Sequence, residues 1–162
     1  MGNGYLYEPV VYPDKRLRLK CRDVESVDET EKEIFVRMYL TMKKYNGVGF
    51  AAPQAGILRK MLVADTGQEP VFLANPFIEK KAGLERFDEG CLSVPGETVN
   101  IKRPGKIRVV GLDQNGKKKE IDAEGLLARV IQHEIDHLNG KLIIDYMSVL
   151  ERVKFGLRRR VK

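Results

Sequence analysis

The sequence predicts an α+β fold, in which a mostly antiparallel sheet packs around a central helix, with one helix before it and a basic helix at the C-terminus. Two observations predict this class. Apolar residues follow a helical period near the start of the chain and again near its end, and short β-rich runs fill residues 61–123 between them. Strands that are grouped between helices, instead of alternating with them, are typical of antiparallel sheets.

The first helix is predicted to begin at Asp28, because Glu31 stands three residues later in the spacing of a capping box. Apolar side chains then recur every four residues over 34–42 and form one helical face. An Asn-Gly pair at 46–47 ends the helix. Residues 47–56 are rich in glycine and alanine, and we expect them to form a loop.

Three short runs have the composition of strands: residues 61–65, 71–75 and 106–113. A hairpin turn is predicted at 113–116, where the sequence reads Asp-Gln-Asn-Gly.

The second helix is predicted from Ala123 to Asn139, with Asp122 as its N-terminal cap and Gly140 at its end. A final strand is expected over residues 141–145.

Length and composition fit one globular domain. The chain has 162 residues, of which 43% are apolar and 32% are charged. No apolar run approaches the roughly 20 residues that a membrane span needs, and no secretory signal opens the chain. We therefore expect a cytoplasmic protein with no membrane contact, whose cysteines form no disulfide and whose Cys21 is a small buried residue.

The most informative segment lies in the second predicted helix. It holds the chain's two histidines, His133 and His137, which are four residues apart and so share one helical face. Two imidazoles in this spacing can bind one metal ion, and Glu134 between them can act as a general base. Glu134 also falls within an apolar arc, where an unpaired carboxylate would cost several kcal/mol. The arc consists of Leu126, Leu127, Val130, Ile131, Ile135 and Leu138, and the opposite, polar side consists of Arg129, Gln132, Asp136 and Asn139.

Two histidines leave a zinc-like site one protein ligand short. Cys91 is the best candidate for the third, because Gly90 and Pro95 bound a turn around it. A thiolate with two imidazoles would leave a fourth position for water. Asp136 and Asp145 are the rival candidates.

Three strings together resemble the motifs of one family, the peptide deformylases of the bacterial type. They are Gly47–Gln54 (GVGFAAPQ, against GxGxAAxQ), Glu89–Ser93 (EGCLS) and Gln132–Gly140 (QHEIDHLNG, against QHExDHLxG). The strings stand in the family's order, and the resemblance covers nearly the whole chain. The sequence departs from the family pattern at Phe50, where an aliphatic residue is usual, and at Glu97 and Thr98, near which the family often has an arginine.

The resemblance implies the roles of the site residues. Glu134 takes a proton from the attacking water and later delivers it to the departing amine. The Gln54 side chain and the Leu92 backbone N–H bind the developing oxyanion, although Gln54 without the resemblance could also be a surface loop residue. Glu89 forms an ion pair with Arg103 that orients the loop of the third ligand. The metal ligands implied by the resemblance are Cys91, His133 and His137.

The implied substrate is the N-formylmethionyl end of nascent peptides. A tight site beside Gly49 and Leu92 admits a formyl group and excludes an acetyl group. Val48 and Val130 border a pocket for the methionine side chain, with ordinary core packing as the alternative for both. The residues expected to contact the substrate are Val48, Gly49, Gly90, Leu92, Val130 and His133.

The expected cofactor is one divalent metal ion. One sulfur and two nitrogens suit Zn(II), Fe(II), Ni(II) and Co(II). The resemblance implies Fe(II) in the cell, with Zn(II), Ni(II) or Co(II) in purified protein.

The net charge of +6 is concentrated in residues 148–162, which carry +5, so residues 1–147 carry +1. We expect a single catalytic domain over 1–147 and a basic helix or tail of the same domain over 148–162. Such a tail suggests contact with ribosomal RNA, whereas the nearly neutral body does not indicate DNA binding. In the alternative, this helix packs on the core and its basic face is solvated. Its apolar stripe consists of Val149, Val153, Leu157 and Val161.

Two rival functions share these features. A metallopeptidase can use the same His-Glu-x-x-His motif. A non-catalytic, ribosome-associated binding module could hold a structural metal, but such a site is normally closed by four protein ligands.

Overall fold

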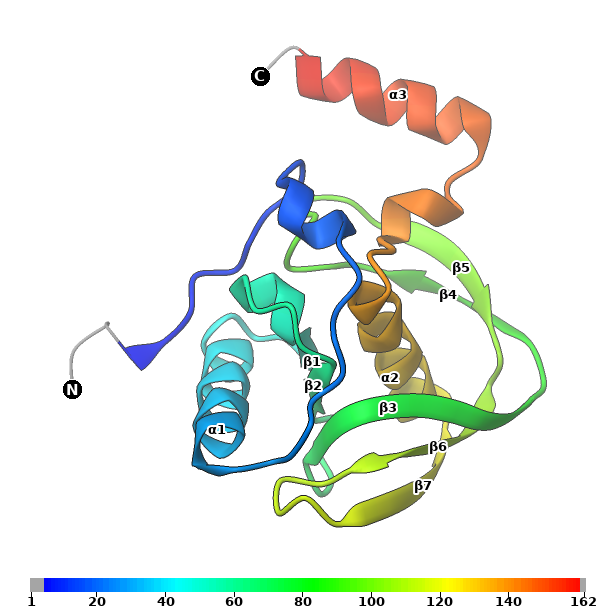
Figure 1. Cartoon of the computed structure of the whole chain (residues 1–162). Coiled ribbons are helices and arrows are strands. Elements are labelled where there is room, and N and C mark those ends of the chain that lie inside the picture. Colours follow the sequence, from blue (N-terminus) through cyan, green and yellow to red (C-terminus); the bar gives the residue numbers. More distant parts are fainter. Residues whose placement is uncertain (1–4, 161–162) are drawn as a thin grey trace.

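The computed structural model describes residues 5–160 and confirms the α+β class (Figure 1). Five strands form one antiparallel sheet in the order β1-β2-β3-β6-β7, and β4 pairs with β5 in a separate antiparallel ribbon. The strands are β1 (Gly49–Ala51), β2 (Met61–Ala64), β3 (Val71–Ala82), β4 (Glu85–Glu89), β5 (Val99–Arg103), β6 (Lys106–Leu112) and β7 (Lys118–Glu124). The helices are α1 (Glu29–Lys44), α2 (Gly125–Leu138) and α3 (Val149–Arg160), with 3-10 turns η2 (Lys15–Arg18), η3 (Ala52–Ala55) and η4 (Ile143–Tyr146).

Helix α2 lies at the centre of the molecule (Figure 1). It contacts β1, β2, β6 and β7 of the large sheet, and its Arg129 reaches the backbone of β4 and β5. Ile131 and Leu138 of α2 are buried in the same core cluster as Leu62 and Val109 of the sheet. Burying each such side chain stabilises the fold by about 1.5–3 kcal/mol, so the helix is held firmly between sheet and ribbon.

Helix α1 begins as the sequence predicts. The Asp28 side chain accepts a hydrogen bond from Thr30 N at 2.8 Å, and the Glu31 side chain accepts one from Asp28 N at 3.4 Å. These bonds satisfy amide groups that the first helical turn leaves without partners. The apolar face of α1, with Phe35 and Met38, is buried against the sheet.

The predicted loop over residues 47–56 is wrong in its central part. Residues 49–51 form β1, which pairs with residues 62–64 of β2, and the next four residues form η3. The small side chains that indicated a loop are buried here against α1 and α2, and at Gly49 a larger side chain would collide with α2.

Two predicted boundaries around α2 are also wrong. Asp122 does not cap the helix, because it lies in β7 and pairs with Arg108 at 2.7 Å. The chain instead turns into α2 at Gly125, which has φ +56°, a conformation that favours glycine. Residues 141–145 form no strand, because Asp145 accepts a hydrogen bond from Leu142 N at 2.8 Å and closes the turn η4.

The predicted apolar stripe of α3 is exposed in the described residues, although the helix does pack on the core through another side chain. Val149 is 81% exposed, Val153 53% and Leu157 57%; Val161 lies outside the described residues. Phe155, on the other side of the helix, is only 6% exposed and anchors α3 with its ring 5.7 Å from that of Tyr12. Within residues 5–160, no helix is long and apolar enough to span a bilayer.

Candidate metal centre

Three potential metal ligands meet where α2 faces the segment after β4. The Sγ atom of Cys91 lies 3.2 Å from Nε2 of His137. Cys91, His133 and His137 each offer one potential ligand atom, and these three atoms lie within 4.8 Å of one another. Among the described residues, they form the one group of three or more potential metal-binding side chains. The structure therefore brings together the three side chains singled out from the sequence.

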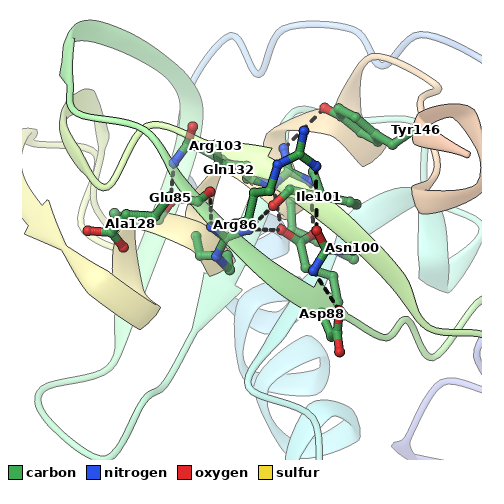
Figure 2. Close-up of polar contacts among 12 residues, drawn as sticks. Glu85, Arg86, Asp88, Asn100, Ile101, Arg103, Ala128, Gln132 and Tyr146 are labelled. Atoms are coloured by element: carbon green, nitrogen blue, oxygen red, sulfur yellow. Dashed lines mark hydrogen bonds and ion pairs between the residues drawn. The ribbon is translucent and has the colours of Figure 1, made fainter.

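Both rival ligands have other partners. The Oδ2 atom of Asp136 accepts hydrogen bonds from Arg103 at 2.8 Å and from the Tyr146 hydroxyl at 2.7 Å; Figure 2 shows Arg103 and Tyr146 beside each other. Asp145 pairs with Arg18 at 2.5 Å. Neither carboxylate belongs to the cluster, so the two rival predictions are wrong.

The donor set fits a divalent transition-metal ion. One thiol and two imidazoles are the side chains that such ions prefer. Burial lowers the pKa of His137 well below its usual range, which keeps its imidazole neutral, as ligation requires. Burial would also lower the pKa of His133, but its hydrogen bonds to Cys91 and Glu89 raise it. Ligation of a metal ion would require His133 and Cys91 to be deprotonated.

The carboxylate of Glu134 is buried beside the cluster. It is 3% exposed, and its Oε2 atom has no hydrogen-bond partner among the described residues. Burial raises the pKa of Glu134 to about 7, a value suited to taking and giving protons near neutral pH. Gly49 allows this position, because a Cβ atom there would meet Glu134 Oε1 and would lie 2.6 Å from Val130 Cγ1.

The carboxylate of Glu89 links the ribbon to α2. It accepts hydrogen bonds from Arg103 at 2.7 and 3.0 Å, from Arg129 at 2.7 Å and from Nδ1 of His133 at 3.0 Å. Burial would raise the pKa of Glu89, but the hydrogen bonds from His133 and Arg103 lower it to about 2. An ionised Glu89 thus fixes the orientation of the His133 ring.

Arg129 and Gln132 were predicted on the polar side of α2, and in the structure this side is buried at both residues. Arg129 is 7% exposed and donates to the carbonyl oxygens of Ile101 at 3.0 Å and Glu85 at 2.9 Å, besides Glu89. Gln132 donates to Pro104 O at 2.9 Å. The β4–β5 ribbon covers this side of the helix (Figure 2). The sequence held one signal: Arg129 stands four residues before His133, on the same helical face.

The side chain of Gln54 is held against the cluster. Its Oε1 atom accepts from Ala51 N at 2.8 Å, and its Nε2 atom lies 3.2 Å from Ser93 Oγ and 3.9 Å from Cys91 Sγ. Gln54 is fully buried, so it is not a surface loop residue. Ser93, which is not among the predicted site residues, sets the direction of the Gln54 amide group.

A cavity of about 970 Å³ opens beside the cluster. Val48 is exposed to it, whereas Val130 is buried and serves both the core and the cavity wall. The six residues expected to contact a substrate all line this cavity: Val48, Gly49, Gly90, Leu92, Val130 and His133.

An α+β fold with a Cys-His-His cluster, a buried carboxylate and an adjoining cavity defines the class of metal-dependent hydrolases. Within that class, the chain belongs to the polypeptide deformylase family, whose sequence profile matches residues 7–153.

Relatives and solved structures agree with this assignment. The chain is 43% identical over 156 residues to the peptide deformylase of Thermodesulfovibrio yellowstonii, covering 93% of this chain and 94% of that one. It is 47% identical over 149 residues to that of Hydrogenovibrio crunogenus, covering 90% and 88% of the two chains. The peptide deformylase of Ehrlichia chaffeensis in complex with actinonin superposes with a TM-score of 0.90 at 38% identity, covering 95% of each chain. That of Acinetobacter baumannii with Met-Ala-Ser bound gives 0.84 at 29% identity, covering 88% of this chain and 98% of that one.

Proposed function

We propose that this chain hydrolyses the N-formyl group of formylmethionyl nascent peptides at one divalent metal ion held by Cys91, His133 and His137. Membership of the deformylase family gives the reaction. One observation supports the proposed site above all others: the three potential ligands converge within 4.8 Å of one another at the cavity that Glu134 lines.

Proton transfer belongs to Glu134 in this proposal. The bound ion supplies Lewis acidity, which favours attack of water on the formyl carbon at neutral pH. Glu134 takes the proton of the attacking water and passes it to the amine nitrogen as the C–N bond breaks. Its raised pKa, about 7, supports both roles.

The developing oxyanion is bound by the Gln54 amide and by the backbone N–H of Leu92. Ser93 and Ala51 fix the Gln54 side chain with its amide nitrogen toward Cys91. Among the hydrogen bonds of the described residues, none uses the Leu92 N–H, so this donor is available. Donors fixed in advance stabilise a transition state without reorganisation.

Selection of formyl over acetyl comes from the close packing of Gly49 against Glu134 and Val130. The methionine side chain lies against Val48 and Val130, and Gly90 contacts the peptide. The related enzyme of Acinetobacter baumannii, solved with Met-Ala-Ser bound, supports a peptide of this kind as the occupant of the cavity.

The expected ion is Fe(II) in the cell, with Zn(II), Ni(II) or Co(II) in purified protein, since all four accept this donor set. Purification without oxygen followed by metal analysis tests this identity. Stoichiometric zinc with full activity would contradict it.

The function itself is tested by formate release from formyl-Met-Ala-Ser. We expect release that stops when a chelator removes the metal and returns when Fe(II) or Co(II) is added. Acetyl-Met-Ala-Ser and longer unformylated peptides are the controls. Cleavage of the unformylated peptides without release of formate would favour a metallopeptidase and contradict the proposal.

A further inference from the structure

The cavity beside the metal centre is acidic, although the chain as a whole carries a net charge of +6. Among the described residues that line the cavity, Arg129 is the one lysine or arginine, and His133 is the one histidine. Arg129 is buried and already donates a hydrogen bond to Glu89. The carboxylates that line the cavity are those of Glu8, Asp88, Glu89, Glu97 and Glu134.

Glu8 and Asp88 are exposed, so their carboxylates lie where the cavity meets solvent. Asp88 accepts a hydrogen bond from Asn100 at 2.8 Å (Figure 2). Among the side chains that the structure describes, neither carboxylate takes part in an ion pair. Both charges therefore act on whatever enters.

Glu97 differs from these two because it is balanced. Its Oε2 atom lies 2.7 Å from Nη2 of Arg158 on α3, and its side chain is 17% exposed. The C-terminal helix thus neutralises one of the three acidic groups at the rim, and removal of Arg158 would expose a further negative charge to the cavity.

The wall of the cavity also contains a buried polar atom without a hydrogen-bond partner among the described residues. Glu134 Oε2 is buried and unpartnered among the described residues, and it lines the same cavity. A volume of about 970 Å³ accommodates a peptide of several residues. A divalent ion bound by the Cys91 thiolate would have a net charge of +1. An ionised Glu134 would offset this charge, so the carboxylates at the rim would still make the cavity acidic.

We propose that Glu8, Asp88 and Glu97 are specificity-determining residues that favour formylpeptides with lysine or arginine directly after the formylmethionine. The inference rests on the proposed function and names the substrate class within it. Rim carboxylates attract a cationic peptide and repel an anionic one. Because this attraction acts on binding and not on bond breaking, it changes KM and leaves kcat nearly constant.

The test compares three substrates on the metal-loaded full chain: formyl-Met-Lys-Lys-amide, formyl-Met-Ala-Ser-amide and formyl-Met-Glu-Glu-amide. At low salt, we expect kcat/KM to be roughly fivefold higher for the lysine peptide than for the glutamate peptide, the size expected for charges several ångströms apart at a solvated rim. The difference should shrink as salt rises from about 0.01 M to about 1 M, because the Debye length falls tenfold.

Charge variants make the test specific. Asp88→Asn combined with Glu8→Gln should bring the lysine-to-glutamate ratio close to one. Arg158→Gln frees Glu97 and should raise the ratio, whereas Glu97→Gln leaves Arg158 as a free cation and should lower it. The matched control is Glu25→Gln, which removes an exposed carboxylate that does not line the cavity and should leave every rate unchanged.

Equal kcat/KM for the lysine and glutamate peptides, with the neutral peptide still deformylated, would overturn the inference and leave the proposed function intact. A preference that survives the double variant would also overturn it. No formate from any of the three peptides would instead refute the proposed function.

Discussion

At the scale of single residues, the geometry of the site depends on Glu89. Its buried carboxylate accepts four hydrogen bonds, from Arg103, Arg129 and His133. Partners of this kind fix the ring of a metal-binding histidine and change metal affinity when they are removed. Glu89 therefore connects the fold of the β4–β5 ribbon with the chemistry on α2.

Glu89→Gln should weaken metal retention by about 10- to 100-fold. The glutamine amide replaces one acceptor oxygen by a donor nitrogen, so the His133 ring loses its fixed orientation. The buried guanidinium groups of Arg103 and Arg129 also lose the negative charge that they pair with. Metal content after dialysis against a graded chelator measures this effect. Glu85→Gln, which changes an exposed carboxylate on the same strand, is the control. Equal metal retention in Glu89→Gln and wild type would contradict the role assigned to Glu89.

The sequence predicts some residues of the site and not others, and the difference is physical. The spacing of His133 and His137 is local, because one helical turn brings them together. Cys91 is distant in sequence and could be selected only by its side-chain chemistry and its motif. The burial of Arg129 could not be predicted, because it depends on the ribbon that covers α2.

At the scale of elements, α1 was predictable because its signals are local. The capping box and the apolar face specify it without reference to other segments. The strand β4 could not be predicted in this way, because its sequence Glu-Arg-Phe-Asp-Glu has almost no alternation of apolar and polar residues. The strand forms through its backbone pairing with β5. Likewise, Asp122 has the residue type of a helix cap, but register in β7 places it beside Arg108.

The two predicted caps can be compared directly. Asp28→Ala removes a side chain that caps α1 and should lower the free energy of unfolding by about 1 kcal/mol. Asp122→Ala removes only an exposed ion pair and should cost less, about 0.5 kcal/mol. Urea denaturation measures both. A larger loss for Asp122→Ala would contradict the observed start of α2.

At the scale of the whole molecule, the basic C-terminal helix α3 contacts the rim of the cavity beside the metal centre. Phe155 packs in the cluster that contains Val94 and touches Cys91, and Arg158 pairs with Glu97 at the cavity rim. Exposed apolar side chains and Lys154 of α3 can meet a partner, whereas Arg152, Arg158 and Arg159 already donate hydrogen bonds within the fold. The division of the chain at residues 147 and 148 stays a prediction.

We propose ribosomal RNA as that partner, on the basis of the charge of +5 in residues 148–162. Deleting this segment should weaken co-sedimentation with ribosomes at low salt, and added salt should weaken binding of the intact chain. Phe155→Ala is the control: it keeps every charge, should retain binding, and should destabilise the fold by about 3 kcal/mol. Unchanged co-sedimentation after the deletion would contradict the proposed contact with ribosomal RNA.

The most direct test of the account is the pairing of metal content with formate release in Glu134→Gln. If Glu134 moves the proton while Cys91 and the two histidines hold the ion, the variant should keep one metal ion per chain. Its rate with formyl-Met-Ala-Ser should fall by about 10²- to 10⁴-fold. Wild-type turnover in this variant, or loss of the metal together with the activity, would contradict the account.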